Sequence, residues 1–113
     1  AGELKHGPIA LIDQDLPVFV VVPPQGRDQL HDKVVSNIQE IRARGARTIV
    51  LAEEGDTEVE PYADLWIKLP KCSTLLQPLL ATVPLQVFAC ELATQLGHDV
   101  DQPRNLAKSV TVE

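Results

Sequence analysis

Cysteine is scarce in this sequence, and its two positions suit neither a metal site nor a redox motif. Cys72 and Cys90 are too few and too far apart for a zinc ribbon or a CxxC pair. The first residues also lack the basic and then apolar pattern of a secretory leader. We therefore expect both thiols to be reduced and the protein to be cytoplasmic.

Basic charge is also in short supply, and no apolar run is both long and unbroken. The 113 residues carry 16 acidic and 10 basic side chains, which gives a net charge of −6. A nucleic-acid-binding surface needs a basic excess to displace counterions, so we expect no nucleic-acid partner. The longest apolar stretch, residues 75–96, contains two prolines and several polar residues. Because a membrane span needs about 20 nearly uninterrupted apolar residues, we expect no membrane association.

The common catalytic motifs are absent as well. There is no glycine-rich phosphate loop, no GxSxG motif and no His–Cys pair at a catalytic spacing, and Gly26 alone is not a phosphate cradle. Segment 53–60 holds four glutamates and one aspartate, which suggests a cation site. Hard cations need carboxylates that converge from a fixed geometry, whereas we expect this segment to be a polar surface loop. We therefore expect neither a metal nor a cofactor.

Hydrophobic periodicity predicts strands that alternate with helices. Residues 17–22 form a continuous apolar run, which is typical of a strand buried on both faces of a parallel sheet. Apolar residues at helical spacing follow over 29–44, and a second apolar run covers 47–52. A strand, a helix and a strand in succession make one right-handed βαβ unit. A third strand is predicted over 64–69.

Single residues indicate where these elements begin and end. Asp28 is the predicted N-cap of the first helix, and Gly45 is its predicted stop. A final helix is predicted over 74–96, where Pro84 should kink it or break it in two. Apolar residues cover more than one side of this helix, which indicates deep burial or a partner. Trp66 is interpreted as a packing residue.

The number of elements predicts an incomplete domain. A length of 113 residues fits one small domain, but a doubly wound domain normally has about five strands, and only three are found. We predict an α/β fold with a three-layer αβα arrangement around a mostly parallel sheet, of flavodoxin-like or Rossmann-like type. The predicted domain is truncated on its N-terminal side.

A few side chains are candidates for chemistry. His6 can transfer a proton near neutral pH, although local sequence alone favours a surface histidine in a turn. Lys108 is the one reactive group of the final thirteen residues, and the simple alternative is a solvated surface amine. His31 on the polar side of the first helix and His98 beside a helix stop are interpreted as structural.

Two segments together carry a family resemblance. They are residues 1–8, AGELKHGP, and residues 99–113, DVDQPRNLAKSVTVE. With the βαβ unit between them, Ser-Asn at 36–37 and Val-Pro-Leu-Gln at 83–86, they resemble the C-terminal end of the glucosamine-6-phosphate synthase family. These enzymes are the glutamine:fructose-6-phosphate aminotransferases (isomerising). The resemblance covers the whole chain. It implies that residues 1–98 are part of an SIS sugar-phosphate isomerase subdomain and that residues 99–113 are an active-site tail.

The resemblance also implies roles for three residues. In this family, ammonia from a glutaminase domain converts fructose 6-phosphate to glucosamine 6-phosphate on two SIS subdomains. His6 matches the histidine that opens the sugar ring and reaches the neighbouring subunit's site. Lys108 matches the lysine that forms a Schiff base with the sugar carbonyl, and Ala107 matches a residue whose backbone contacts the sugar. The implied partners are the two sugar phosphates, a second copy in a homodimer, and the glutaminase and first SIS domains.

The chain also departs from the family pattern. The family's glutaminase nucleophile is an N-terminal cysteine, whereas residue 1 here is alanine and we expect no glutaminase domain in this sequence. The phosphate-binding loop and the proton-shuttling glutamate of the family belong upstream of Ala1, and Glu3 does not occupy that glutamate's position. We therefore predict a fragment that is inactive by itself. Two alternatives remain open: a non-catalytic SIS module that binds a phosphosugar, and an interaction fragment that uses the apolar helix 74–96.

Overall fold

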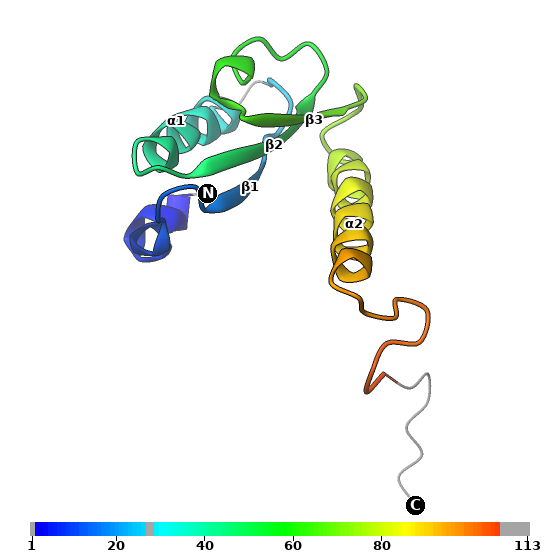
Figure 1. Ribbon diagram of the computed structural model, residues 1–113. Helices are drawn as coiled ribbons and strands as arrows, with labels where there is room; N and C mark the ends of the chain where they lie inside the picture. Colours follow the sequence, from blue (N-terminus) through cyan, green and yellow to red (C-terminus); the bar gives the residue numbers. More distant parts are fainter. Residues whose placement is uncertain (1, 27–28, 107–113) are drawn as a thin grey trace, which may run out of the picture. The chain divides into compact units, whose positions relative to one another are not determined.

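The chain forms two compact units, Ala1–Ala81 and Thr82–Glu113. The computed structural model describes residues 2–26 and 29–106 of them. The first unit contains a parallel sheet and the helix that packs on it (Figure 1). The second unit contains most of the last helix and the segment that follows it.

The sheet has three strands in the order β1-β2-β3, and both pairs are parallel. The strands are β1 (Pro17–Val21), β2 (Arg47–Glu53) and β3 (Leu65–Leu69). The middle strand is the most buried of the three, because it has a neighbour on each side. The parallel sheet predicted from the continuous apolar runs is confirmed. Among the described residues, the outer edges of β1 and β3 have no strand partner.

Helix α1 (Leu30–Arg42) supplies the other half of the core. Its residues Val34, Val35, Ile38 and Ile41 recur at helical spacing, and all four are buried. The core cluster joins α1 to β2 and to the ends of the neighbouring loops, and its members are Val22, Val34, Val35, Ile38, Val50, Ala52 and Val59. Trp66 packs against this cluster, which confirms its predicted packing role.

The ends of α1 agree in part with the sequence prediction. The helix stops before Gly45, whose φ of 92° lies in the left-handed region that glycine adopts readily. At the other end Gln29 occupies the N-cap position without a side-chain cap. The predicted cap, Asp28, lies outside the described residues.

Short 3₁₀ helices fill the connections. Helices η1 (Gly2–His6) and η2 (Pro8–Leu11) precede β1, and the proline of η2 stands in its first turn. Helix η3 (Glu60–Tyr62) lies between β2 and β3 and contacts α1. The contact of η3 with α1 keeps the connection between β2 and β3 close to the helix that covers the sheet.

The last helix, α2 (Gln77–Gln95), is continuous and contains Pro84. Of the two outcomes predicted at Pro84, a kink or a break, the break does not occur. Proline removes only one helical hydrogen bond, and the helix continues on both sides of it. Pro78 lies in the first turn, as expected. Gln77 Nε2 donates a buried hydrogen bond of 2.6 Å to the carbonyl of Val22, which fixes the start of α2 at the end of β1.

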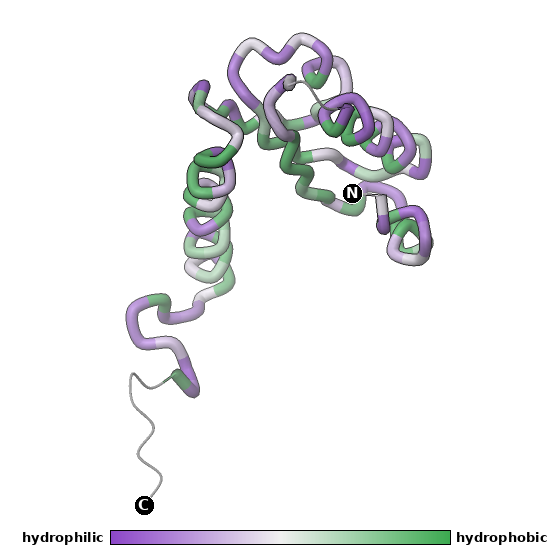
Figure 2. The backbone as a smooth tube through the Cα atoms, turned by 180° about the vertical axis from the view of Figure 1, so that it is seen from behind, coloured by the Kyte–Doolittle hydropathy of each residue, from purple (hydrophilic) through white to green (hydrophobic). Residues whose placement is uncertain are grey.

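Most apolar side chains of α2 are exposed, and of its residues only Gln77 and Ala81 are buried. The sequence left two alternatives for this helix, deep burial or a partner, and within the described residues deep burial is not found. Figure 2 shows hydrophobic colouring along most of this helix, followed by a mainly hydrophilic segment. No helix among the described residues has the length and apolarity needed to span a bilayer.

Candidate functional site

The three residues implied by the family resemblance are described only in part. His6 is exposed at the end of η1. Ala107 and Lys108 lie outside the described residues, so the structure gives no geometry for a contact between Lys108 and His6. The described part of the predicted tail therefore ends one residue before Ala107.

That described part is a sequence of tight turns. Gly97, with a φ of 77°, ends α2, and the His98 N–H returns to the Ala93 carbonyl at 2.9 Å. Asp99 Oδ1 then accepts from the backbone N–H groups of Asp101 and Gln102 at 3.0 and 2.9 Å. These bonds give residues 97–102 a defined course.

A second turn includes Pro103, Arg104 and Asn105. The Leu106 N–H donates to the Pro103 carbonyl at 3.2 Å, and Asn105 has a φ of 66°. Asparagine tolerates this left-handed conformation better than most residues, which explains its use in the turn.

A separate crevice lies at the carboxyl ends of the three strands, the edge where open α/β sheets bind ligands. It has a volume of about 400 Å³ and is lined by Pro24, Gln25, Glu53, Glu54, Gly55, Asp56, Lys71, Cys72, Ser73 and Thr74. Three of these side chains are acidic and one is basic, and Lys71 Nζ is 3.7 Å from Glu53 Oε1. Excess negative charge opposes phosphate binding here. The crevice is therefore a poor binding site for phosphate.

Beside this crevice, a buried histidine pairs with a buried aspartate. His31 Nε2 is 2.7 Å from Asp56 Oδ2, and the side chains are 1% and 5% exposed. Asp56 Oδ1 accepts hydrogen bonds from the backbone N–H groups of Glu58 and Val59. The pair thus links the first turn of α1 to the connection between β2 and β3.

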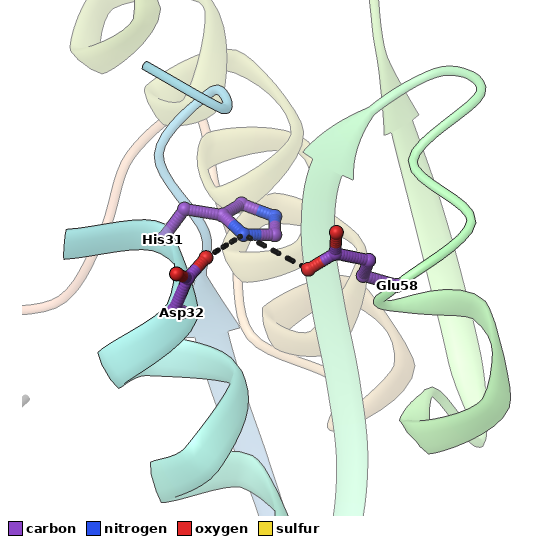
Figure 3. A group of neighbouring side chains, drawn as sticks. All are labelled: His31, Asp32 and Glu58. Atoms are coloured by element: carbon purple, nitrogen blue, oxygen red, sulfur yellow. Dashed lines mark hydrogen bonds and ion pairs between the residues drawn. The ribbon is translucent and has the colours of Figure 1, made fainter. Parts of the chain in front are cut away.

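The other ring nitrogen of His31 faces two more carboxylates. Figure 3 shows Asp32 and Glu58 on either side of the ring, with Nδ1 3.4 Å from Asp32 Oδ1 and 3.7 Å from Glu58 Oε2. Burial by itself would lower the pKa of His31. The hydrogen bond and charge of Asp56, together with Asp32 and Glu58, outweigh it and raise the pKa above its usual value.

Two sequence predictions are corrected here. His31 is not on the polar side of its helix but is almost fully buried, and residues 53–60 are not purely a surface loop because Asp56 and Val59 are buried. Local sequence could not reveal this pair, since 25 residues separate its members. The only indication of this site in the sequence was the high density of carboxylates in segment 53–60.

A second polar network lies at the opposite edge of the sheet. Asp64 Oδ2 accepts from the Thr48 N–H at 2.7 Å, while Asp64 Oδ1 is 2.8 Å from Arg42 Nη1. Arg42 also donates to the Tyr62 carbonyl at 3.0 Å. The backbone hydrogen bond from Thr48, and then the Arg42 charge, lower the pKa of Asp64 below its usual value. This network joins α1, β2 and β3, and its role is structural.

Comparison with known families decides how the chain is classified. The SIS domain family model matches residues 1–96. The chain belongs to the SIS domain family. This SIS domain is 78% identical over 114 aligned residues to glutamine–fructose-6-phosphate aminotransferase (isomerizing) from Streptomyces coelicolor. It is 68% identical to the enzyme of that name from Mycobacterium tuberculosis strain H37Rv. The resemblance inferred from the two terminal motifs is confirmed.

The SIS domain accounts for only part of these relatives. Each alignment covers 100% of this chain and 18% of the relative. The fold is also that of a solved structure, the C-terminal domain of glucosamine-fructose-6-phosphate aminotransferase from Francisella tularensis. That match has a TM-score of 0.75 and 39% sequence identity, and it covers 90% of this chain and 28% of the other. The predicted α/β class with a parallel sheet is confirmed.

Proposed function

We propose that this SIS domain is the C-terminal isomerase portion of a glutamine–fructose-6-phosphate aminotransferase. The reaction converts fructose 6-phosphate and ammonia derived from glutamine to glucosamine 6-phosphate and glutamate. The observation that carries this proposal is 78% identity along the full chain with the Streptomyces coelicolor relative of that name. The chain spans 18% of that relative, so in this proposal the reaction is carried out by a longer protein. The proposal includes that the chain alone is inactive.

Two residues of this chain carry the chemistry in the proposal. His6 moves the proton that opens the sugar ring, a role for which an imidazole is suited near neutral pH. Lys108 attacks the sugar carbonyl, and its amine must be neutral when it does so. The backbone of Ala107 contacts the sugar in residues 99–113, the predicted active-site tail, whereas residues 1–98 form the isomerase part. The turns around Asp99 and Pro103 support this assignment, because they lead an ordered chain toward Lys108.

The proposal also specifies partners and location. Fructose 6-phosphate and glucosamine 6-phosphate are the ligands, a glutaminase and a first SIS domain complete the enzyme, and the enzyme is a homodimer. The acidic crevice supports a phosphate site outside this chain, since its own charge is unfavourable for phosphate. The proposed location is the cytoplasm.

Borohydride trapping tests the proposed role of Lys108. In the whole protein, Nζ of Lys108 adds to the C2 carbonyl of fructose 6-phosphate and water leaves, which gives a C=N bond. Hydride from borohydride then reduces that bond to a stable secondary amine. Peptide mass spectrometry should place the sugar-phosphate adduct on Lys108.

The control is Lys108→Arg, which retains the charge but cannot form the adduct at this position. A protein that binds fructose 6-phosphate without any adduct at Lys108 and without turnover would instead be a non-catalytic phosphosugar-binding module. An adduct on another lysine would contradict the assignment of Lys108 while leaving the aminotransferase reaction in place.

A further inference from the structure

The environment of the His31 ring differs at its two nitrogens. Nε2 faces the buried carboxylate of Asp56 at 2.7 Å, so the proton of a neutral ring resides on Nε2 and is donated to Asp56. Nδ1 then carries a lone pair, and it faces Asp32 Oδ1 and Glu58 Oε2 (Figure 3). A lone pair and two carboxylates that converge on one point repel one another until a cation, either a proton or a metal ion, lies between them.

The spacing of these three atoms fits a metal ion. His31 Nδ1, an Asp32 oxygen and a Glu58 oxygen all lie within 4.8 Å of one another, and the two distances from Nδ1 are 3.4 and 3.7 Å. Ligands at about 2.0–2.1 Å from a tetrahedral zinc ion are roughly 3.3–3.4 Å apart. A small closing movement of the two exposed carboxylates brings all three atoms to that distance.

Asp56 gives independent support, because it holds His31 in the way that metal-binding histidines are held. Such histidines donate their second ring N–H to a carboxylate, which fixes the tautomer and the ring orientation. Asp56 is 5% exposed, and two backbone N–H groups of its own loop fix it in turn. The ring is therefore oriented before any ion arrives, unlike a histidine on a mobile surface loop.

We propose that His31, Asp32 and Glu58 form a binding site for a divalent transition-metal ion such as zinc, with Asp56 as the positioning residue. An imidazole with two carboxylates is a nitrogen and oxygen ligand set that suits zinc, whereas calcium and magnesium take oxygen ligands. Asp32 and Glu58 are 74% and 55% exposed, so an ion can reach the site and water can complete its coordination. The bound ion joins the first turn of α1 to the connection between β2 and β3. This proposal is independent of the sugar chemistry.

Hydrogen exchange with zinc alone as the probe tests the site in the whole protein. Zinc should slow amide exchange in peptides that cover residues 30–34 and 56–60, because it cross-links these two segments. Titration of this protection gives the affinity of this site, separately from any thiol or histidine elsewhere. Asp32→Asn and Glu58→Gln should each weaken that affinity about tenfold or more, since each removes one anionic ligand. Both positions are exposed, so the variants should retain the fold.

Two further variants sharpen the result. Glu60→Gln removes an exposed charge from the connection between β2 and β3 without removing a ligand, and its zinc response should equal that of the wild type.

Asp56→Asn tests the positioning residue. In this variant Oδ1 can keep the two backbone hydrogen bonds while the amide NH₂ faces His31 Nε2. The histidine must then carry its proton on Nδ1, which removes the metal ligand but preserves the hydrogen bond. Zinc affinity should fall about ten- to hundredfold in this variant.

The proposal is overturned if saturating zinc leaves both peptides unprotected, in which case a proton is the only cation that occupies the cluster. It is also overturned if the protection survives unchanged in both Asp32→Asn and Glu58→Gln. Equal weakening in Glu60→Gln would show that general negative charge, rather than this ligand set, attracts the ion.

Discussion

Asp64 shows how a single side chain joins three elements of the fold. It accepts the Thr48 N–H in β2, pairs with Arg42 at the end of α1, and itself lies directly before β3. The hydrogen bond from Thr48 and the Arg42 charge both favour the carboxylate, and so the folded state holds the pKa of Asp64 below its usual value. Folding stability must therefore depend on whether Asp64 is ionised.

We expect the contribution of Asp64 to the free energy of unfolding to be lost in acid. Since the pKa of Asp64 is lower in the folded state than in the unfolded state, its contribution is complete above the unfolded value of about 3.8. It disappears as the pH falls through the lower folded value. Asp64→Asn should lower the free energy of unfolding by about 1 kcal/mol near pH 6, because Asp64 is one-third exposed and solvent screens it. Urea unfolding from pH 6 to pH 2.5 measures the difference.

The difference in free energy of unfolding between the wild type and Asp64→Asn should become steadily smaller below about pH 4, where the wild-type carboxylate becomes protonated. Asp101→Asn, at an exposed position after α2, is the control and should show no such pH-dependent gap. A constant gap over the whole range would mean that the charge of Asp64 does not contribute.

At the scale of elements, the stop of α1 depends on one glycine. Gly45 has a φ of 92°, and a Cβ added there would lie 2.6 Å from Gln14 Oε1 and 3.3 Å from the Gln14 Cα. Gly45→Ala therefore combines an unfavourable backbone conformation with a close contact. We expect it to lower the free energy of unfolding by about 1–3 kcal/mol, measured by urea unfolding.

Gly55→Ala separates these two causes. Gly55 has nearly the same φ, 91°, but a Cβ added there meets nothing within 4 Å. Its alanine variant should show the backbone cost alone, and so a smaller loss than Gly45→Ala. If both variants lost the same free energy of unfolding, Gln14 would be able to move away from the added Cβ at no measurable cost.

The sequence predicted local elements better than the side-chain pairs between them. The three strands, α1 and the Gly45 stop follow from apolar runs, helical spacing and glycine, all of which act within a few neighbouring residues. Whether Pro84 kinks or breaks α2 could not be decided from the sequence, because the effect of one proline depends on the rest of the helix. The pair of His31 and Asp56 was missed because it forms only when α1 packs beside the connection after β2. Lys108 and Ala107 were assigned through a family resemblance and not from geometry.

At the scale of the whole molecule, the apolar surface of α2 is the main departure from an independent domain. Its exposed apolar side chains include Leu79, Val83, Val87, Phe88 and Leu92, which are between 43% and 67% exposed. An apolar surface of this extent on one helix is typical of an interface. In the proposed enzyme, the remaining domains and the second subunit would supply the covering surface.

We therefore expect the isolated 113-residue chain to self-associate. Analytical ultracentrifugation should show a mass that rises with concentration, and Val83→Ser combined with Val87→Ser should shift the chain toward monomer. Gln86→Ser combined with Gln95→Ser, at exposed polar positions of the same helix, is the control and should leave association unchanged. A wild-type chain that stays monomeric at all concentrations would contradict an interface on α2.

The parallel pairing of the strands also determines the order in which the sheet can form during synthesis. Pro17 pairs with Arg47, and Ile49 pairs with Leu65, so neither pair of strands can be closed by a tight turn. Among the described residues, β1 finds its strand partner only after α1 and β2 have both been made. Contacts between segments this far apart in sequence form slowly, because the intervening loop must close first. The pairing of β1 with β2 is therefore a late step during synthesis, and the apolar β1 is open to wrong strand pairing before it.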